Sequence, residues 1–153
     1  FRPDQNINRA EFLKVILEAV NEGPSVVNGS LGFIDVDVNA WYMGYIARAK
    51  ALGIFAGDQG KGTARPADPI NRVESLKILA ETLRATGGFK VPVCQDLAYS
   101  DVSGTSWFYN YVCFNDQYSL FMKTGSMAFS PGKFASRGEL AEALFTLRLN
   151  GIL

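Results

Sequence analysis

The chain repeats itself, and this repetition limits the folds open to it. Two kinds of half-unit alternate along the 153 residues. The first kind, here called the front half, begins at Phe33 as FIDVDVNAWYMGYIARAKALGIFAG and again at Tyr99 as YSDVSGTSWFYNYVCFNDQYSLFMK. The second kind, the back half, begins at Phe1, Ala64 and Phe129. Because short repeats cannot bury their apolar faces alone, we expect the units to share one core.

Each back half predicts a helix with a marked start. Asn8, Asn71 and Ser136 have side chains that accept hydrogen bonds from the amides of a first helical turn. A glutamate follows three residues later in every copy and can bond back to the cap; these residues are Glu11, Glu74 and Glu139. Apolar residues then recur at helical spacing, in the first copy at Ala10, Leu13, Ile16, Leu17 and Val20. The pattern predicts three helices, each opened by a capping box.

Each front half predicts a loop and then a helix of about three turns. The helices are expected to begin near Ala40 and Ser106 and to end at Gly53 and its counterpart Ser119. Glycine, proline and polar residues crowd positions 21–32 and 86–95, which we interpret as connectors. Since 48% of the residues are hydrophobic, a chain of this length can bury one core. The sequence therefore predicts a mainly α protein that forms one compact domain.

Composition excludes several functions. Fifteen Lys and Arg residues balance fifteen Asp and Glu residues, so no overall field attracts nucleic acid or an acidic membrane surface. No apolar run approaches the length that spans a bilayer. The absence of histidine removes the commonest general base, and two cysteines cannot build a four-thiolate zinc site. Cys94 and Cys113 are expected either to form a disulfide or to remain buried thiols.

Two loops partly match known cofactor-binding motifs but lack residues that those motifs require. The run DVDVNA from Asp35 has the oxygen spacing of a calcium loop, but Ala40 and Ile46 replace the required Gly and Glu. The run GDQGKG from Gly57 is not a P-loop, because Gly62 stands where Ser or Thr must hold magnesium. We therefore predict neither a metal nor another cofactor, and no catalytic constellation that would indicate an enzyme.

One sequence pattern runs through the unit from Phe33 and returns with changes in the unit from Tyr99: Phe-x-Asp-Val, a Trp, a helix, a Gly-rich loop, then x-Pro and Asn-Arg-x-Glu. This pattern resembles the S-layer homology domain over nearly the whole chain. The resemblance gives residues 1–22 as the back half of one unit, 33–86 as a second unit and 99–149 as a third. It implies that such units pack as a pseudo-threefold helical bundle. It also implies an extracellular, cell-surface protein whose grooves between units bind secondary cell-wall polysaccharide, typically through a pyruvylated sugar.

The resemblance assigns candidate ligand contacts. They are Arg9, Arg72, Arg137, Gly57, Asp58, Gly60 and Gly62, together with Trp41 and Trp107. An arginine in a first helical turn places a planar cation beside amides that already favour an anion. Tryptophan offers a flat face to a sugar ring, and glycine lets backbone amides approach a ligand. The alternatives are that each arginine pairs only with a surface carboxylate and that each tryptophan packs in the core.

The units are not equal. Lys123–Ser126 replace the Gly-rich loop in the last unit, and the first unit has no front half in these residues, so Arg9 is expected to lack partners. Arg72 is therefore the first arginine to test.

The leading functional hypothesis is a noncatalytic module that anchors an exported protein to the cell wall. The alternative is a self-assembling surface protein that forms a filament, tube or layer, in which a neighbouring chain completes the first unit. That neighbour would pack on an exposed stripe formed by Leu13, Ile16, Leu17 and Val20.

Overall fold

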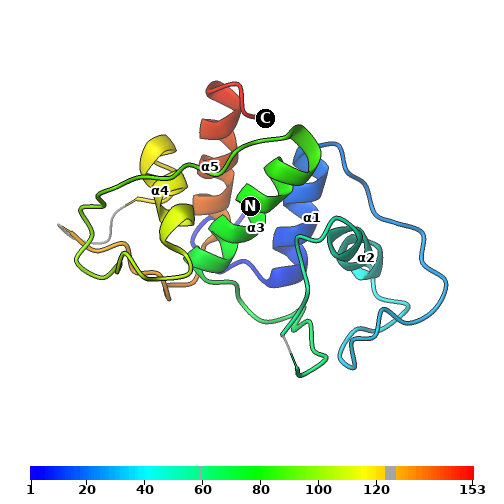
Figure 1. Cartoon of the computed structure of the whole chain (residues 1–153). Helices are drawn as coiled ribbons and strands as arrows, with labels where there is room; N and C mark the ends of the chain where they lie inside the picture. Colours follow the sequence, from blue (N-terminus) through cyan, green and yellow to red (C-terminus); the bar gives the residue numbers. More distant parts are fainter. Residues whose placement is uncertain (59, 123–126) are drawn as a thin grey trace.

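The computed structural model describes residues 1–58, 60–122 and 127–153, and in this part of the chain it contains five helices (Figure 1). Their bounds are α1 Arg9–Ala19, α2 Met43–Ala51, α3 Arg72–Gly87, α4 Tyr109–Tyr118 and α5 Arg137–Leu149. Helices α1, α3 and α5 come from back halves, and α2 and α4 come from front halves. The described residues form isolated β-bridges but no strand, which confirms the prediction of a mainly α protein.

The back-half helices begin at the predicted caps. Asn8 and Ser136 each open a complete capping box, in which the side chain accepts from the third residue and that glutamate bonds back. In α3 only the first half of the box forms, with Asn71 accepting from the amide of Glu74. The Glu74 carboxylate lies beside Arg9 instead. The expected third capping box is therefore incomplete.

The segments that precede these three helices bond to one another in a closed ring. The amide of Ile7 donates to the carbonyl of Ala135, Ala135 donates to Ile70, and Ile70 donates back to Ile7, at 3.0, 2.9 and 3.1 Å. A buried backbone amide must find such a partner, and here each back half supplies one to the next. The three helix starts are thus fixed relative to one another. The pseudo-threefold packing of whole units stays a prediction.

The front-half helices begin later than predicted. Helix α2 starts at Met43 and α4 at Tyr109, because hydrogen-bonded turns occupy the three preceding residues in each copy. Neither helix has a side-chain cap, so the tight turns replace one. Both helices are followed by a residue in the left-handed conformation, Gly53 with φ 72° and Ser119 with φ 53°. The predicted stops are therefore in place.

Asp35 and Asp101 tie each front half to the back half that follows it. The Asp35 carboxylate accepts from the amides of Ala64 and Arg65 at 2.8 and 2.7 Å. Asp101 accepts from Phe129 and Ser130 at the same two distances. The aspartate of the Asp-Val turn thus binds backbone amides, which explains its place in the repeat without a cation. Among the described residues no cluster of three or more potential metal-ligating side chains occurs.

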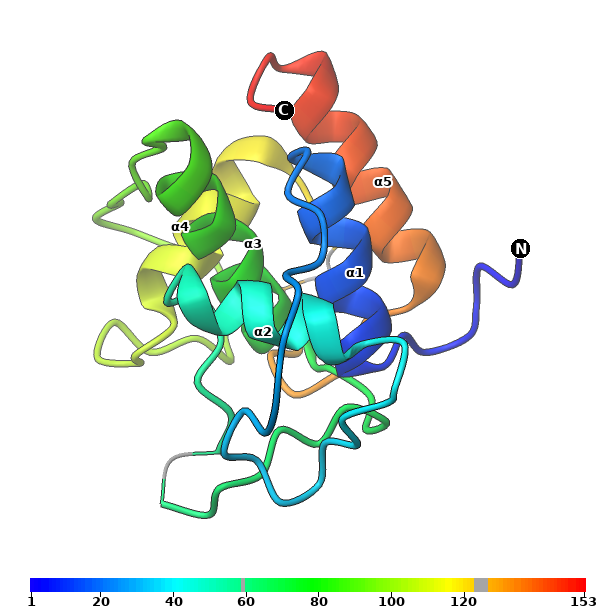
Figure 2. The ribbon, with the colours of Figure 1, turned by 90° about the vertical axis from the view of Figure 1, so that its right-hand side faces the viewer.

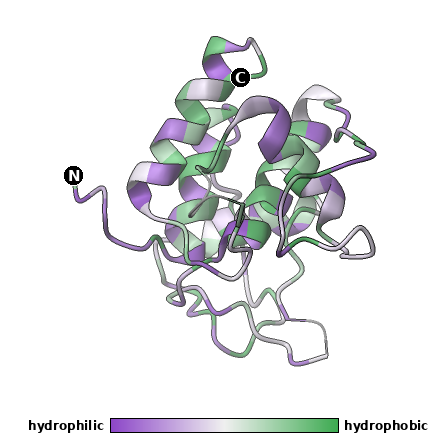
Figure 3. Ribbon diagram, turned by 90° about the vertical axis from the view of Figure 1, so that its left-hand side faces the viewer, coloured by the Kyte–Doolittle hydropathy of each residue, from purple (hydrophilic) through white to green (hydrophobic). Residues whose placement is uncertain are grey.

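The core lies where the back-half helices meet. Figure 2 shows α1, α3 and α5 lying beside one another with α2 crossing in front, and Figure 3 shows hydrophobic residues gathered on the inner sides of the helices. Leu13, Ile16 and Leu17 are fully buried, with exposed fractions of 0%. The expectation that this stripe of α1 is open to a neighbour is therefore wrong. Helix α2 packs on α1, and the open apolar face lies on α5 instead.

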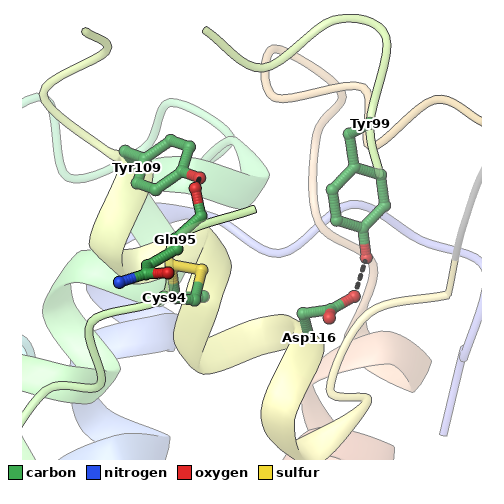
Figure 4. The surroundings of a disulfide bond; sticks show 6 residues. Cys94, Gln95, Tyr99, Tyr109 and Asp116 are labelled. Atoms are coloured by element: carbon green, nitrogen blue, oxygen red, sulfur yellow. Dashed lines mark hydrogen bonds between the residues drawn. A yellow bond between two sulfur atoms is a disulfide. The ribbon is translucent and has the colours of Figure 1, made fainter. Parts of the chain in front are cut away.

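A disulfide joins Cys94 in the second connector to Cys113 in α4, with Cα atoms 5.7 Å apart (Figure 4). Close to it, the Tyr109 hydroxyl donates to the carbonyl of Gln95 at 3.1 Å. The bridge and this hydrogen bond both hold the connector against the first helix of the last unit. No free cysteine remains.

Candidate ligand-binding groove

A pocket of about 250 Å³ opens beside Arg9. Its residues come from three segments far apart in sequence: Arg9 at the start of α1, the loop after α2, and the first turns of α3. Trp107, just before α4, completes the lining. The ring of hydrogen bonds and the packing of α2 and α4 on the back-half helices bring these segments together. Arg9 thus has partners within the chain, contrary to the expectation from the missing front half.

Arg9 is a buried cation that is only partly satisfied. Its exposed fraction is 6%, and its guanidinium lies 5.2 Å from the centre of the Phe55 ring. Nη1 lies 3.2 Å from a Glu74 carboxylate oxygen, close enough for an ion pair. Within the described part of the chain, Nε and Nη1 have no hydrogen-bond partner. Because a buried charged donor is costly when unpaired, these two atoms favour an acceptor from outside the chain.

The loop after α2 forms one wall of the pocket, and close contacts constrain its residues Gly57 and Asp58. Gly57 has φ 67°, and a Cβ atom there would collide with the Thr63 carbonyl and the Phe33 ring. A side chain is therefore excluded at this position. The Asp58 carboxylate accepts from Arg65 at 2.9 Å and from Thr63 at 3.1 Å. The hydrogen bond from Arg65 is the main reason that the pKa of Asp58 is lowered.

Trp107 and Lys77 stand together at the mouth of the pocket. The Lys77 ammonium lies 5.7 Å from the Trp107 ring, and 61% of Trp107 is exposed. The alternative of core packing therefore does not hold for Trp107. An exposed aromatic face beside two cations, Arg9 and Lys77, suits a ligand that has both an apolar ring face and a negative charge.

The same chain segments match a known family. The model of the S-layer homology domain matches residues 33–74 and 98–141, which together make up more than half of the chain. The chain belongs to the S-layer homology domain family. Members of this family are cell-surface proteins, which assigns the chain to the cell surface and supports a role in cell-wall anchoring.

Relatives share this region within much longer proteins. The chain is 30% identical over 148 residues to "Exoglucanase XynX" of Acetivibrio thermocellus and to "Amylopullulanase" of Thermoanaerobacterium thermosulfurigenes. In both cases 96% of the chain is matched, but it spans only 13% and 8% of the relatives' length. It is also 33% identical over 92 residues to "Cell surface glycoprotein 1" of Acetivibrio thermocellus, covering 54% of the chain and 4% of that protein. The enzyme names thus describe proteins of which the chain resembles a small part.

Arg72 occupies the equivalent position in the next S-layer homology unit, but its surroundings differ. It is 1% exposed, and it donates to the carbonyl of Phe129 at 2.7 Å and to Glu139 at 2.5 Å. The Phe121 and Phe129 rings lie within 6 Å of the guanidinium, at 5.8 and 5.7 Å. Arg72 thus makes two internal hydrogen bonds and is closed to solvent, although its Nε, like that of Arg9, has no hydrogen-bond partner in the described part of the chain. Arg72 as a ligand contact stays a prediction. The Lys123–Ser126 segment, equivalent to the Gly-rich loop, lies outside the described residues.

Arg137 and Trp41 mark the incomplete counterpart of the Arg9 pocket. Arg137 is paired with Glu11 at 3.0 Å and its side chain is 35% exposed. Trp41 is 55% exposed, and the Lys14 ammonium lies 5.5 Å from its ring, as Lys77 does at Trp107. The S-layer homology loop that would face Arg137 belongs to the front half that these residues lack. Trp41 and Arg137 therefore do not join the pocket at Arg9.

Of the predicted residues, the structure brings together Arg9, Gly57, Asp58 and Trp107. Gly60 and Gly62 shape the same loop with positive φ but do not line the pocket. The other lining residues were not predicted as ligand contacts, and they are Ile54, Phe55, Ala56, Glu74, Lys77 and Ile78. A signal was present in the repeats, because Phe55 returns as Phe121 and Lys77 has its counterpart in Lys14. Glu74 was treated only as a cap, although its carboxylate lies at the arginine.

In the part of the chain that the structure describes, no helix is both long enough and apolar enough to cross a membrane.

Proposed function

We propose that the chain is a noncatalytic module that anchors a cell-surface protein to a secondary cell-wall polysaccharide through the pocket at Arg9. The observation that carries this proposal is the buried, partly unpaired guanidinium of Arg9 in a pocket of about 250 Å³. Membership of the S-layer homology family supports it. A pyruvylated sugar fits the chemistry, since it presents a carboxylate and an apolar ring face in one residue.

In this proposal the carboxylate of the sugar accepts from Arg9 Nε and Nη1. Charge-assisted hydrogen bonds of this kind are about twice as strong as neutral ones. Lys77 adds a second cation, and the Trp107 face packs against the sugar ring. Glu74, with a carboxylate oxygen 3.2 Å from Nη1, helps to hold the guanidinium in place. The pocket thus binds an anion, although the chain as a whole carries no net charge.

Calorimetry with purified pyruvylated wall polysaccharide tests the proposal. The unchanged chain should bind, and Arg9→Met should lower the affinity by about tenfold or more, as expected for loss of a bidentate charged contact. Arg137→Met is the matched control, because Arg137 has the same place in its helix but does not line the pocket at Arg9. It should leave affinity unchanged.

A second control is polysaccharide from which the pyruvyl group has been removed, which should bind weakly to every variant. Circular dichroism verifies that the Arg9 variant is folded. Equal affinity of Arg9→Met and the unchanged chain would contradict the proposal, as would absence of binding by both.

Self-assembly, in which a neighbouring chain completes the first unit, stays a separate hypothesis. Its direct test is the mass of the chain in solution at high concentration.

A further inference from the structure

Two Asn-Gly pairs occur in the sequence, Asn28-Gly29 in the first connector and Asn150-Gly151 after α5. An asparagine before a glycine can modify itself, because the next backbone nitrogen reaches the side-chain amide carbon and glycine has no side chain to block the approach. The reaction is fastest when neither this nitrogen nor the asparagine amide is held by a hydrogen bond. The two pairs have the same chemistry, so the fold decides which of them reacts.

The structure leaves the first pair open to reaction. Asn28 and Gly29 are both exposed, and within the described residues neither makes a hydrogen bond. The nearest hydrogen bonds along the connector are from the Ser25 amide to a carbonyl of α2 at 3.0 Å and from the Gly32 amide to Ser30 Oγ at 3.1 Å. A Cβ atom at Gly29 would meet nothing within 4 Å, so no neighbouring group hinders this nitrogen.

The second pair is held by two hydrogen bonds. The Asn150 side-chain amide donates to the Thr146 carbonyl at 2.8 Å, and the Gly151 amide donates to the Arg148 carbonyl at 3.1 Å. Both bonds belong to the C-terminal turn of α5, where unpaired carbonyls accept from capping groups. Asn150 and Gly151 are also exposed, and a Cβ atom at Gly151 would likewise meet nothing within 4 Å. The two pairs thus differ in hydrogen bonding and not in steric access.

We propose that Asn28 is a site of self-modification in the folded protein. The Gly29 nitrogen, after losing its proton to the solvent, forms a bond to Asn28 Cγ. The bond from Cγ to Nδ2 breaks, so that ammonia leaves and a cyclic succinimide remains. Water then opens this ring, and attack at Cγ gives aspartate, whereas attack at the backbone carbonyl carbon gives isoaspartate. The balance is one water consumed and one ammonia released.

The reaction changes the charge of the connector and not the fold. A carboxyl that is ionised at neutral pH replaces a neutral amide, so the balanced chain gains a negative charge. Because Asn28 makes no hydrogen bond in the described part of the chain, its conversion breaks none. Figure 2 shows the connector on the outside of the molecule, where it crosses α2. Neither Asn28 nor Gly29 lines the pocket at Arg9, so the proposal is independent of polysaccharide binding.

Incubation of the folded chain in mildly alkaline buffer, followed by trypsin digestion and mass spectrometry, tests the proposal. Asn28 lies in the tryptic peptide 15–48 and Asn150 in the peptide 149–153, and fragmentation locates the modified residue. We expect the mass increase of amide hydrolysis to appear at Asn28 at least about tenfold faster than at Asn150, where two hydrogen bonds must break first. Isoaspartate should form beside aspartate, and a protease that cleaves before aspartate but not before isoaspartate distinguishes them.

Two controls separate the effect of the sequence from that of the fold. In guanidinium chloride, which removes the hydrogen bonds of α5, the two Asn-Gly pairs should react at similar rates. Gly29→Ala should slow the reaction of Asn28 about tenfold or more, because the methyl group hinders the attacking nitrogen. The same variant should leave the rate at Asn150 unchanged.

Equal rates at Asn28 and Asn150 in the folded chain would overturn the proposal, as would a faster reaction at Asn150. Formation of aspartate without isoaspartate would overturn the cyclisation step. An Asn28 that reacts in guanidinium chloride but not in the folded chain would show that the connector protects it, contrary to the proposal. Binding of polysaccharide, measured on incubated and fresh samples, reports on Arg9 separately.

Discussion

Arg9 at the start of α1 pairs with Glu74 at the start of α3, with 3.2 Å between Nη1 and the carboxylate. The same pairing joins Arg72 to Glu139 at 2.5 Å and Arg137 to Glu11 at 3.0 Å. Each arginine of the Asn-Arg-x-Glu pattern thus contacts the glutamate of the next back half, and the three pairs close a cycle. The glutamates have two roles in this arrangement, because two of them also complete a capping box.

Removing the buried member of this cycle should destabilise the fold. We expect Arg72→Met to lower the free energy of unfolding by about 3 kcal/mol, because it leaves Glu139 and the Phe129 carbonyl without their buried partner. Arg137→Met is the matched control and should cost about 1 kcal/mol or less, since its ion pair is partly exposed. Urea unfolding followed by circular dichroism measures both. Equal losses would show that burial of Arg72 is not what stabilises the pair.

Low pH should weaken the ion pair between Arg72 and Glu139. Burial has the largest single effect and raises the pKa of Glu139, but the hydrogen bonds from Arg72 and from the Ser136 backbone and the charges of Arg72 and Lys133 together lower the net pKa from 4.5. A carboxyl with a lowered pKa in the fold stabilises the protein above its unfolded pKa and loses this contribution as the pH falls. The stability difference between the unchanged chain and Glu139→Gln should therefore be constant above pH 4.5 and shrink below it. Urea unfolding at several pH values measures this difference, and one that does not vary with pH would contradict the assignment.

High pH should weaken the hydrogen bond from Tyr111 of α4 to Glu81 of α3. Burial, and then the hydrogen bond to Glu81, raise the pKa of Tyr111 to about 12. The protonated phenol therefore contributes stability that is complete below pH 10.0, its unfolded value, and is lost as the pH rises toward 12. In Tyr111→Phe, the loss of stability between pH 10.0 and about 12 that this contact causes should be absent.

Absorbance of the phenolate during titration measures the effect. Burial and the bond to Asp116 likewise raise the pKa of Tyr99 to about 12 (Figure 4). The late-titrating absorbance should decrease in Tyr111→Phe and in Tyr99→Phe, and most in the double variant. A late phase of unchanged size in all three would contradict the predicted contacts.

The disulfide should contribute to stability through the connector. Cys94 and Cys113 are 19 residues apart, and a bridge over a loop of this size typically contributes about 3 kcal/mol by restricting the unfolded chain. Reductant should therefore lower the unfolding temperature of the unchanged chain. The double variant Cys94→Ser, Cys113→Ala provides the control, because reductant should have no effect on it. A mass measurement with and without reduction and alkylation verifies that the bridge forms.

The repeats fix much of this fold by local rules. Asn8 and Ser136 predict where helices begin, because a cap acts within one turn, and Gly53 and Ser119 predict where helices end. The front-half starts were misplaced because turns without a side-chain cap leave no sequence signal before Met43 and Tyr109. The family, the helical class and the candidate arginines likewise follow from motifs that can be read in sequence order.

Only the tertiary structure distinguishes residues that occupy equivalent positions in the repeats. The three arginines occupy one motif position, yet Arg9 lines a pocket, Arg72 is buried in internal bonds and Arg137 lies at an incomplete site. In the same way Leu17 is covered, whereas Phe145 is open. The reason is that each back half packs against the front half of another unit, so the surroundings of a residue depend on a segment far away in sequence. The local sequence therefore determined where the helices begin and end. The packing of each back half against another unit decided which of the three equivalent arginines lines a pocket.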